Sequence, residues 1–427
     1  MDVKTRIRST AVSTFASARY LNFLRGKARL RRKLSAKPAA VHYFHQVDDP
    51  YSHLAVQKLD QLKAAYHLPF KAHLVSKPAP EFQGSSDHFE NWALRDALSI
   101  AGNYDTSLQV ARQPGPAEVQ AANNKLAVHL NQPDFAQKAV EAGTALWSGR
   151  SEKDAARQPG ETALREGDAL RNKLGHYLGG MFYFDGEWFW GIDRIRLLER
   201  RLIEEGYGDD RVGLCVPEPA SVDTSELDAG EVVLEYFPSL RSPYTAIGHQ
   251  RVLDLLARSG VTVKLRPVMP MLMRGIPAPF AKQQYIIIDA AREARARNIP
   301  FGRIVDPFGE PVKRAFALFP AALAMAKGMQ FVTAYLSAAW AEGIDIATEA
   351  GLKRVTANAD IDWKNLQQAA PGTDWEVVLE DNLSDMLAAG LWGVPSFRVT
   401  GGNDDTTFAC WGQDRIWRVE NEIASRL

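Results

Sequence analysis

The chain contains one succession of residues twice, and this repeat limits what it can fold into. In the first half, Val41-His42-Tyr43-Phe44 is followed after four residues by Asp49-Pro50-Tyr51-Ser52. In the second half, Val233-Leu234-Glu235-Tyr236-Phe237 is followed after four residues by Ser242-Pro243-Tyr244-Thr245. We therefore expect the two halves to fold into domains of one architecture.

The match returns near the end of each half. Trp190-Gly191-Ile192-Asp193-Arg194-Ile195 corresponds to Trp411-Gly412-Gln413-Asp414-Arg415-Ile416. The offset is 193 positions from Pro50 to Pro243 but 221 positions from Trp190 to Trp411. The second copy is therefore expected to hold about one or two more helices inside it.

Each copy has the same order of expected elements: a strand, a helix that begins at a proline, a second strand, a long alanine-rich helical stretch, two strands joined by a turn, and a last helix. Before the last helix, the first copy has them at Ala40–His45, Pro50–Tyr66, Phe70–Val75, about Phe89–Trp147, Met181–Phe184 and Glu187–Trp190. The second copy has them at Glu231–Pro238, Pro243–Ser259, Val261–Pro267, about Ala281–Thr356, Ser396–Thr400 and Thr407–Trp411. The expected fold class is α/β, with two tandem thioredoxin-like domains that each carry an inserted helical subdomain.

The length of 427 residues fits two or three domains, and 46% hydrophobic with 24% charged residues is typical of a globular protein. We place a basic arm at residues 1–37, the first domain at 38–215, a linker at 216–230 and the second domain at 231–427. The linker is rich in Pro, Ser, Asp and Glu, which favours a connecting segment.

The chain has two cysteines, Cys215 and Cys410, and no Cys-x-x-Cys. This pattern argues against a disulfide framework, a zinc site and a dithiol redox centre. A reducing cytoplasm fits such a chain best. Cys410 stands at the end of an expected strand, where we expect a buried apolar thiol.

The basic arm holds eleven Lys or Arg against one acid, Asp2. Apolar residues lie among the bases, so a basic amphipathic helix would fit: Phe15, Tyr20, Leu21, Phe23, Leu24 and Leu30. One interpretation is contact with an anionic membrane surface or nucleic acid, although no specific nucleic-acid motif is present; another is a transit peptide. We favour a third, a solvated arm or a helix packed on the body, because a charge run usually marks a solvated face.

Ser242 and Pro243 stand where a strand gives way to a helix, which favours Ser242 as the N-cap and Pro243 as the first helical residue. The first turn of a helix presents N–H groups and a positive dipole end, which stabilise a thiolate. No cysteine stands here, so the thiolate would come from a bound thiol, with the Ser242 hydroxyl donating to its sulfur.

Two further motifs are candidates for binding. Gly393-Val394-Pro395-Ser396-Phe397 puts a proline before a strand; if its bond is cis, the Val394 main chain could pair with an extended peptide-like ligand, and if trans it is an edge-strand proline. Gly412-Gln413-Asp414-Arg415 opens the last helix. Gln413 and Asp414 could bind the carboxylate and ammonium of a small ligand, or the segment could only cap the helix.

Together these three motifs resemble the 2-hydroxychromene-2-carboxylate isomerase and kappa-class glutathione transferase family, a branch of the DsbA superfamily. The likeness covers about residues 231–427 in full and 40–200 in degraded form. It implies that glutathione is the co-substrate, that Ser242 faces its sulfur, that Val394 and Pro395 pair with its cysteinyl main chain, and that Gln413 and Asp414 hold its γ-glutamyl end. It also implies dimers, which suggests an intrachain pseudo-dimer of the two domains.

The first copy departs from these motifs. Asp49 replaces the serine, and its carboxylate would repel a thiolate. Aligning Gly179-Gly180-Met181-Phe182-Tyr183 with Gly393–Phe397 puts Met181 in place of the proline, and Ile192 replaces the glutamine. We expect a structural or pairing domain here rather than a site of altered chemistry.

The wall of the electrophile pocket is less determined. Its candidates are Tyr244, Thr245, Met271 and Arg274, the last two in the methionine-rich loop after the second strand. These methionines could form an adaptable apolar wall or only fill the core.

The expected function is therefore a glutathione-dependent isomerase or transferase that acts on a small electrophile in the second domain. One alternative is a non-catalytic thioredoxin-like binding or scaffold protein. A DsbA-type thiol-disulfide oxidoreductase is less favoured, because it would need a cysteine pair that the chain lacks.

Overall fold

The computed structural model describes residues 3–84, 86–150, 159–225, 227–372 and 374–427. Contacts divide the chain into two compact units, one of Leu21–Pro219 and one of Met1–Tyr20 with Ala220–Leu427. Asp2 of the expected arm and residue 226 of the expected linker lie outside the described residues.

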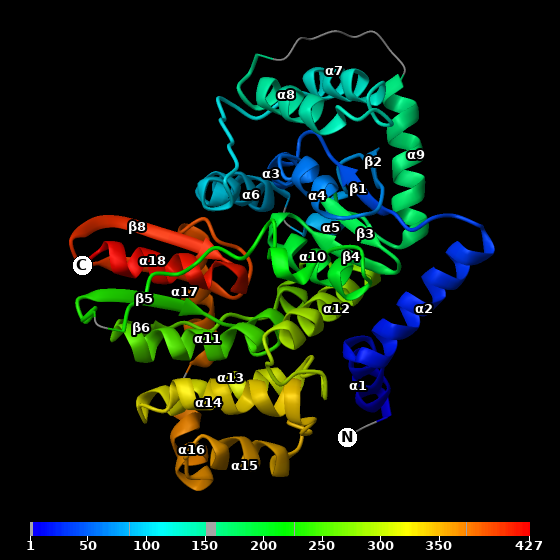
Figure 1. The fold of residues 1–427 in the computed structure, drawn as a ribbon. Helices are drawn as coiled ribbons and strands as arrows, with labels where there is room; N and C mark the ends of the chain where they lie inside the picture. Colours follow the sequence, from blue (N-terminus) through cyan, green and yellow to red (C-terminus); the bar gives the residue numbers. More distant parts are fainter. Residues whose placement is uncertain (1–2, 85, 151–158, 226, 373) are drawn as a thin grey trace. The chain divides into compact units, whose positions relative to one another are not determined.

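The unit Leu21–Pro219 is built on a four-stranded sheet in the order β2-β1-β3-β4, with bounds β1 Val41–His45, β2 Phe70–Leu74, β3 Met181–Phe184 and β4 Glu187–Trp190 (Figure 1). β1 pairs with β2 in parallel and with β3 antiparallel, and β3 pairs with β4 antiparallel. Its α-helices are α2 (Ala18–Leu34, from Leu21 on), α3 (Pro50–Val56), α4 (Leu59–Ala65), α5 (Pro80–Gln83), α6 (Ser86–Ile100), α7 (Pro116–Ala127), α8 (Phe135–Trp147), α9 (Pro159–Leu174) and α10 (Ile195–Glu204). Short 3₁₀ turns lie at Ala101–Tyr104, Ile192–Arg194 and Asp210–Val212.

The other unit has a sheet of the same kind, in the order β6-β5-β7-β8, with bounds β5 Val232–Phe237, β6 Thr262–Leu265, β7 Ser396–Gly401 and β8 Asp404–Trp411. β5 pairs with β6 in parallel and with β7 antiparallel, and β7 pairs with β8 antiparallel. Its α-helices are α1 (Val3–Ala16), α11 (Pro243–Ser259), α12 (Phe280–Ala296), α13 (Glu310–Ala324), α14 (Gly328–Ser337), α15 (Glu349–Asn358), α16 (Trp363–Ala369), α17 (Trp375–Ala388) and α18 (Ile416–Ser425). Short 3₁₀ turns lie at Met271–Arg274, Ala370–Gly372 and Gln413–Arg415, and a π-helical turn lies at Ala338–Glu342.

The unit of Met1–Tyr20 with Ala220–Leu427 has two larger hydrophobic cores and a small one around Ile247 and Ala290. One lies between the sheet and helices α11 and α18, where Leu234 and Tyr236 of β5 meet Val252 and Ile423. The other lies within the inserted helices and contains Phe316, Phe331, Tyr335 and Trp340. Leu265 of β6 packs against both cores, which joins the sheet to the helical subdomain within one unit.

The mixed α/β class and two four-stranded sheets are present, consistent with two thioredoxin-like regions. The single helix predicted over Pro50–Tyr66 is wrong, because the chain breaks at Gln57 and Lys58 into α3 and α4. The side chain of Gln57 bonds to the main chain of Ser107 at this break.

The helical stretches also extend further than predicted. Beyond the predicted ranges lie α9, which ends at Leu174, and α17, which ends at Ala388. α9 begins at Pro159, a residue that breaks a helix from within but starts one well.

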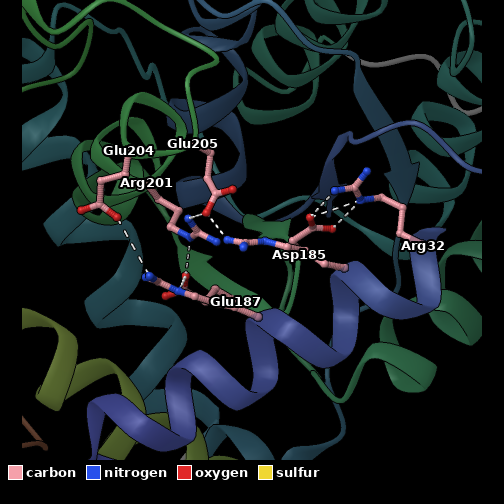
Figure 2. Close-up of polar contacts among 8 residues, drawn as sticks. Arg32, Asp185, Glu187, Arg201, Glu204 and Glu205 are labelled. Atoms are coloured by element: carbon pink, nitrogen blue, oxygen red, sulfur yellow. Dashed lines mark hydrogen bonds and ion pairs between the residues drawn. The ribbon is translucent and has the colours of Figure 1, made fainter.

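The basic arm forms helices α1 and α2. In one unit, Ser13 Oγ of α1 accepts from Ile304 N (3.0 Å). In the other, α2 is fixed by ion pairs to the β3–β4 hairpin and to the residue that follows α10: Arg25 to Glu187 (2.6 Å), Arg32 to Asp185 (2.9 Å) and Arg29 to Glu205 (Figure 2). The interpretation as packed helices agrees with these contacts, and contact with an anionic surface stays a prediction.

Among the described residues, none of the helices combines the length and the apolar character needed to span a bilayer.

Candidate functional site

The three motifs of the second half meet at one edge of the sheet. β5 ends there, β7 begins there and β8 ends there, because Phe237 pairs with Ser396 and Ser396 pairs with Trp411. Ser242 follows β5, Pro395 precedes β7 and Gln413 follows β8. Antiparallel pairing thus brings together residues that lie far apart in the sequence.

Ser242 is the N-cap of α11, with Pro243 in its first turn, as predicted. Its Oγ accepts a hydrogen bond from Thr245 N (3.1 Å) and donates one to Val394 O (3.4 Å). The Val394–Pro395 peptide bond is cis. The hydroxyl therefore stands between the first turn of a helix and the main chain of the proline motif.

Of the predicted pocket residues next to Ser242, only one reaches the surface. Thr245 is fully buried, and its Oγ1 accepts from Ser239 N (3.3 Å). Tyr244 is half-buried, and its hydroxyl donates to Asp289 Oδ2 (2.9 Å), whose carboxylate also pairs with Arg292 (2.6 Å). Thr245 thus supports the turn, and Tyr244 is the residue of the two that can line a pocket.

Gln413 and Asp414 differ in exposure. Gln413 is fully buried, its Oε1 accepts from Arg251 (3.1 Å), and its amide donates to Asp414. Gly248 of α11 packs so closely that an added Cβ would lie 2.8 Å from the Cβ of Gln413. Asp414 is half-buried, so it is the member of the pair that a ligand can reach.

Two cations lie beside the residue that precedes the proline motif. Arg274 donates to Trp392 O (3.1 Å), and burial lowers the pKa of its guanidinium. The Lys282 amino group lies 5.9 Å from the centre of the Trp392 ring, and burial lowers its pKa to about 8. No role was predicted for Lys282; its signal in the sequence is that it carries the sole charge in Phe280–Ile288.

Met271 is half-buried in the 3₁₀ turn that holds Arg274.

Gly393 is required by close packing. The rings of Trp392 and Trp411 meet edge-on with their centres 4.9 Å apart. A Cβ added to Gly393 would lie 2.2 Å from Trp411 Cε2, closer than any side chain can stand. The glycine lets the Trp411 ring lie directly against the main chain before Val394.

The sheet registers correct the predicted alignment of the two halves. Phe44 pairs with Met181 as Phe237 pairs with Ser396. Gly191 N donates to Gly180 O (2.8 Å), as Gly412 N donates to Pro395 O (2.8 Å). Gly180, with φ of +63°, therefore stands where the second half has its proline, and the assignment of Met181 to that place is wrong by one residue.

Neither of the two cysteines occupies the first turn of α3 or α11, where a thiolate would be stabilised. Cys410 is buried in β8, as predicted. Cys215 belongs to the other unit, and burial together with Glu199 raises the pKa of its thiol to about 11. In the part of the chain that the structure describes, no group of three or more His, Cys, Asp or Glu side chains is placed to hold a metal ion.

Part of the chain resembles known proteins. A search of the curated proteins gave no match. Among solved structures, a 2-hydroxychromene-2-carboxylate isomerase is 20% identical, with a TM-score of 0.38 over 45% of this chain and 95% of its own. The cytosolic disulfide reductase DsbM from Pseudomonas aeruginosa is 19% identical, with a TM-score of 0.37 over 45% of this chain and 98% of its own. The family model of the DSBA-like thioredoxin domain matches residues 233–424, so the second half of the chain holds a DSBA-like thioredoxin domain.

Proposed function

We propose that the second half of the chain is a glutathione-dependent isomerase or transferase that acts on a small electrophile at the start of α11. The observation that carries this proposal is the position of the Ser242 hydroxyl, between the first turn of a helix and the Val394 carbonyl. Glutathione, when bound, supplies a thiolate nucleophile.

The Ser242 hydroxyl can serve such a thiolate. Its contact with Val394 O, at 3.4 Å, is long for an O–H···O bond, so little is lost when the hydroxyl turns toward another acceptor. Its other bond, accepted from Thr245 N, leaves the proton available. α11 runs for 17 residues, and its N-terminal end favours a negative charge.

The surrounding charges also fit a tripeptide that is anionic at its carboxylates and cationic at its amino group. Arg274 and Lys282 are the cations that would pair with a carboxylate. Asp414 is the carboxylate that would pair with the ammonium, and Gln413 and Arg251 hold it in position. Tyr244 and Met271 are the half-buried residues that would line the place of the electrophile.

A thiol-disulfide exchange reaction is less well supported. It needs a thiolate in the first turn of α11, and Ser242-Pro243-Tyr244-Thr245 contains no cysteine. A non-catalytic binding protein is the other alternative. Such a protein would not convert an electrophile, whether or not it binds glutathione, so measuring both binding and turnover distinguishes it from the proposed enzyme.

The experiment measures glutathione affinity by titration calorimetry for the full chain, for Ser242→Ala and for Ser425→Ala, an exposed serine at the end of α18. Losing a hydrogen bond to a charged sulfur costs about 1.5–3 kcal/mol, so Ser242→Ala should weaken binding roughly tenfold to a hundredfold, and Ser425→Ala should leave it unchanged. Turnover of a panel of electrophiles is then followed with the same proteins. Absence of glutathione binding to the parent chain would end the proposal, and binding without turnover would favour the non-catalytic alternative.

A further inference from the structure

The unit Leu21–Pro219 contains a cavity of about 140 Å³ at the start of α3. It lies at the edge of the sheet where β1 ends, β3 begins and β4 ends, because Gln46, Gly179 and Trp190 all line it. This is the edge that carries Ser242 in the other unit, as the equivalent bonds of Gly180 and Pro395 show. The first half therefore has a hollow where the second half has its candidate site.

The wall of this cavity is negatively charged. Asp48, Asp49 and Glu90 line it, together with one cation, Lys77. Lys77 is paired with Glu90 at 2.6 Å, and within the described ranges no ion pair is formed by Asp48 or Asp49. A ligand that brings a positive charge would relieve their mutual repulsion.

The aspartates have acceptor capacity left over. Asp49 Oδ2 accepts from Ser52 N (2.8 Å) and Ser52 Oγ (2.7 Å), but Asp49 Oδ1 has only a long contact of 3.4 Å with Tyr51 N. Asp48 Oδ1 accepts from the Gln46 amide (3.0 Å). The main-chain donors Tyr51 N and Ser52 N already serve Asp49, so an anionic ligand would meet carboxylates here instead of donors. These contacts favour a ligand that donates hydrogen bonds.

The other lining residues are mainly apolar, with three glutamines among them, Gln46, Gln83 and Gln113. Phe89, Trp147 and Trp190 line the cavity, and Trp190 packs edge-on against Tyr51 with ring centres 5.6 Å apart. Aromatic faces attract organic cations, and a cavity of roughly 150 Å³ can hold one benzene ring.

We propose that this cavity binds a small organic ammonium ion with an apolar body, held by Asp48 and Asp49 at its charged end and by the aromatic side chains around its body. The first half would then be a binding domain for a positively charged ligand, whereas the second half would bind a negatively charged thiolate. This proposal is independent of glutathione binding, because it concerns the other unit.

The test titrates the full chain with benzylamine, and with benzyl alcohol as a ligand of similar size without the charge. Benzylamine should bind at least about tenfold more tightly than benzyl alcohol, because only the ammonium ion pairs with the aspartates. Asp49→Asn should weaken benzylamine binding by about tenfold or more, and Asp60→Asn, an exposed aspartate on α4, should not.

Asparagine is a good N-cap, so Asp49→Asn should keep α3 folded, which circular dichroism checks. If that variant fails to fold, Asp48→Asn takes its place, because the Asp48 side chain bonds to Gln46 and, among the described residues, to none of α3. Equal affinity for benzylamine and benzyl alcohol, unchanged affinity in a folded aspartate variant, or no benzylamine binding at all would overturn the proposal.

Discussion

At the scale of single residues, the two proposed sites differ at one position, which we expect to decide the charge that each half accepts. Ser242 and Asp49 both cap a helix that begins with proline at the end of the first strand of their sheet. The serine has a proton to donate, whereas the ionised aspartate accepts and already uses the N–H groups of Tyr51 and Ser52. A thiolate suits the first residue, and an ammonium ion suits the second.

We also expect Asp49 to make the affinity for benzylamine depend on pH. Burial, opposed by the hydrogen bonds from Ser52 and aided by the nearby Asp48, raises the pKa of Asp49 to about 6. Below that pH the carboxyl is protonated and loses its attraction for an ammonium ion. Benzylamine stays charged throughout, so its affinity should be constant above about pH 7 and fall by up to about tenfold per pH unit below 6.

The other groups near Asp49 do not explain such a change. Burial lowers the pKa of His45 to about 3 and of His53 to about 4, so both stay neutral from pH 5 to 8, and burial raises the pKa of Tyr43. Asp48, Glu90 and Lys77 are present unchanged in Asp49→Asn, which is the control. A pH profile of benzylamine binding with the same slope in that variant would contradict the assignment to Asp49.

At the scale of elements, the bounds of a strand or helix could be predicted where turn or capping residues mark its ends. The hairpin strands Met181–Phe184 and Glu187–Trp190 were predicted with their observed bounds, because aromatic residues flank an Asp-Gly turn. α11 was predicted with its observed bounds too, since Ser and Pro begin it and Gly260 ends it in a left-handed conformation.

Other elements depend on contacts that the sequence does not display. The break between α3 and α4 involves Gln57 and Ser107, which are fifty positions apart. The one-residue error at Met181 arose because a glycine pair can be matched to the proline motif in either of two registers, and only strand pairing decides between them. Lys282 acquires its position over Trp392 from the packing of α12.

Helix α2 gives a prediction at this scale. Its inner face is held by Arg25 and Arg32, whose partners Glu187 and Asp185 are both buried. Replacing both arginines by alanine should lower the free energy that holds α2 on its unit by about 1–2 kcal/mol. Amide hydrogen exchange in α2 should then be roughly tenfold faster, while β1–β4 keep their protection.

Arg31→Ala with Lys33→Ala is the matched control, because both side chains are exposed and make no ion pair within the described residues. Similar exchange rates in the two double variants would show that the ion pairs do not hold α2.

At the scale of the whole molecule, the chain consists of two units that each have their own sheet. The candidate site around Ser242 lies in one unit and the cavity beside Asp49 lies in the other. Glutathione should therefore slow amide exchange in β5–β8 and benzylamine in β1–β4, each without an effect on the other sheet.

The two substitutions serve as each other's controls. At a ligand concentration near the dissociation constant of the parent chain, Ser242→Ala should strongly reduce the effect of glutathione and keep that of benzylamine, and Asp49→Asn should do the reverse. Protection that spreads through both sheets with either ligand would show that the units do not respond separately.

The carbonyl groups of Gly180 and Pro395 have a consequence for redesign. Each accepts the N–H of the glycine that ends the hairpin, although one belongs to the residue with the least conformational restriction and the other to the residue with the most. The two halves thus share this carbonyl hydrogen bond, although the residue that provides it is a glycine in one half and a proline in the other. Placing a proline at Gly180 would turn that carbonyl away, because proline cannot adopt the φ of +63° found there. Converting the first half to the proline motif would therefore require replacing the whole loop before the strand.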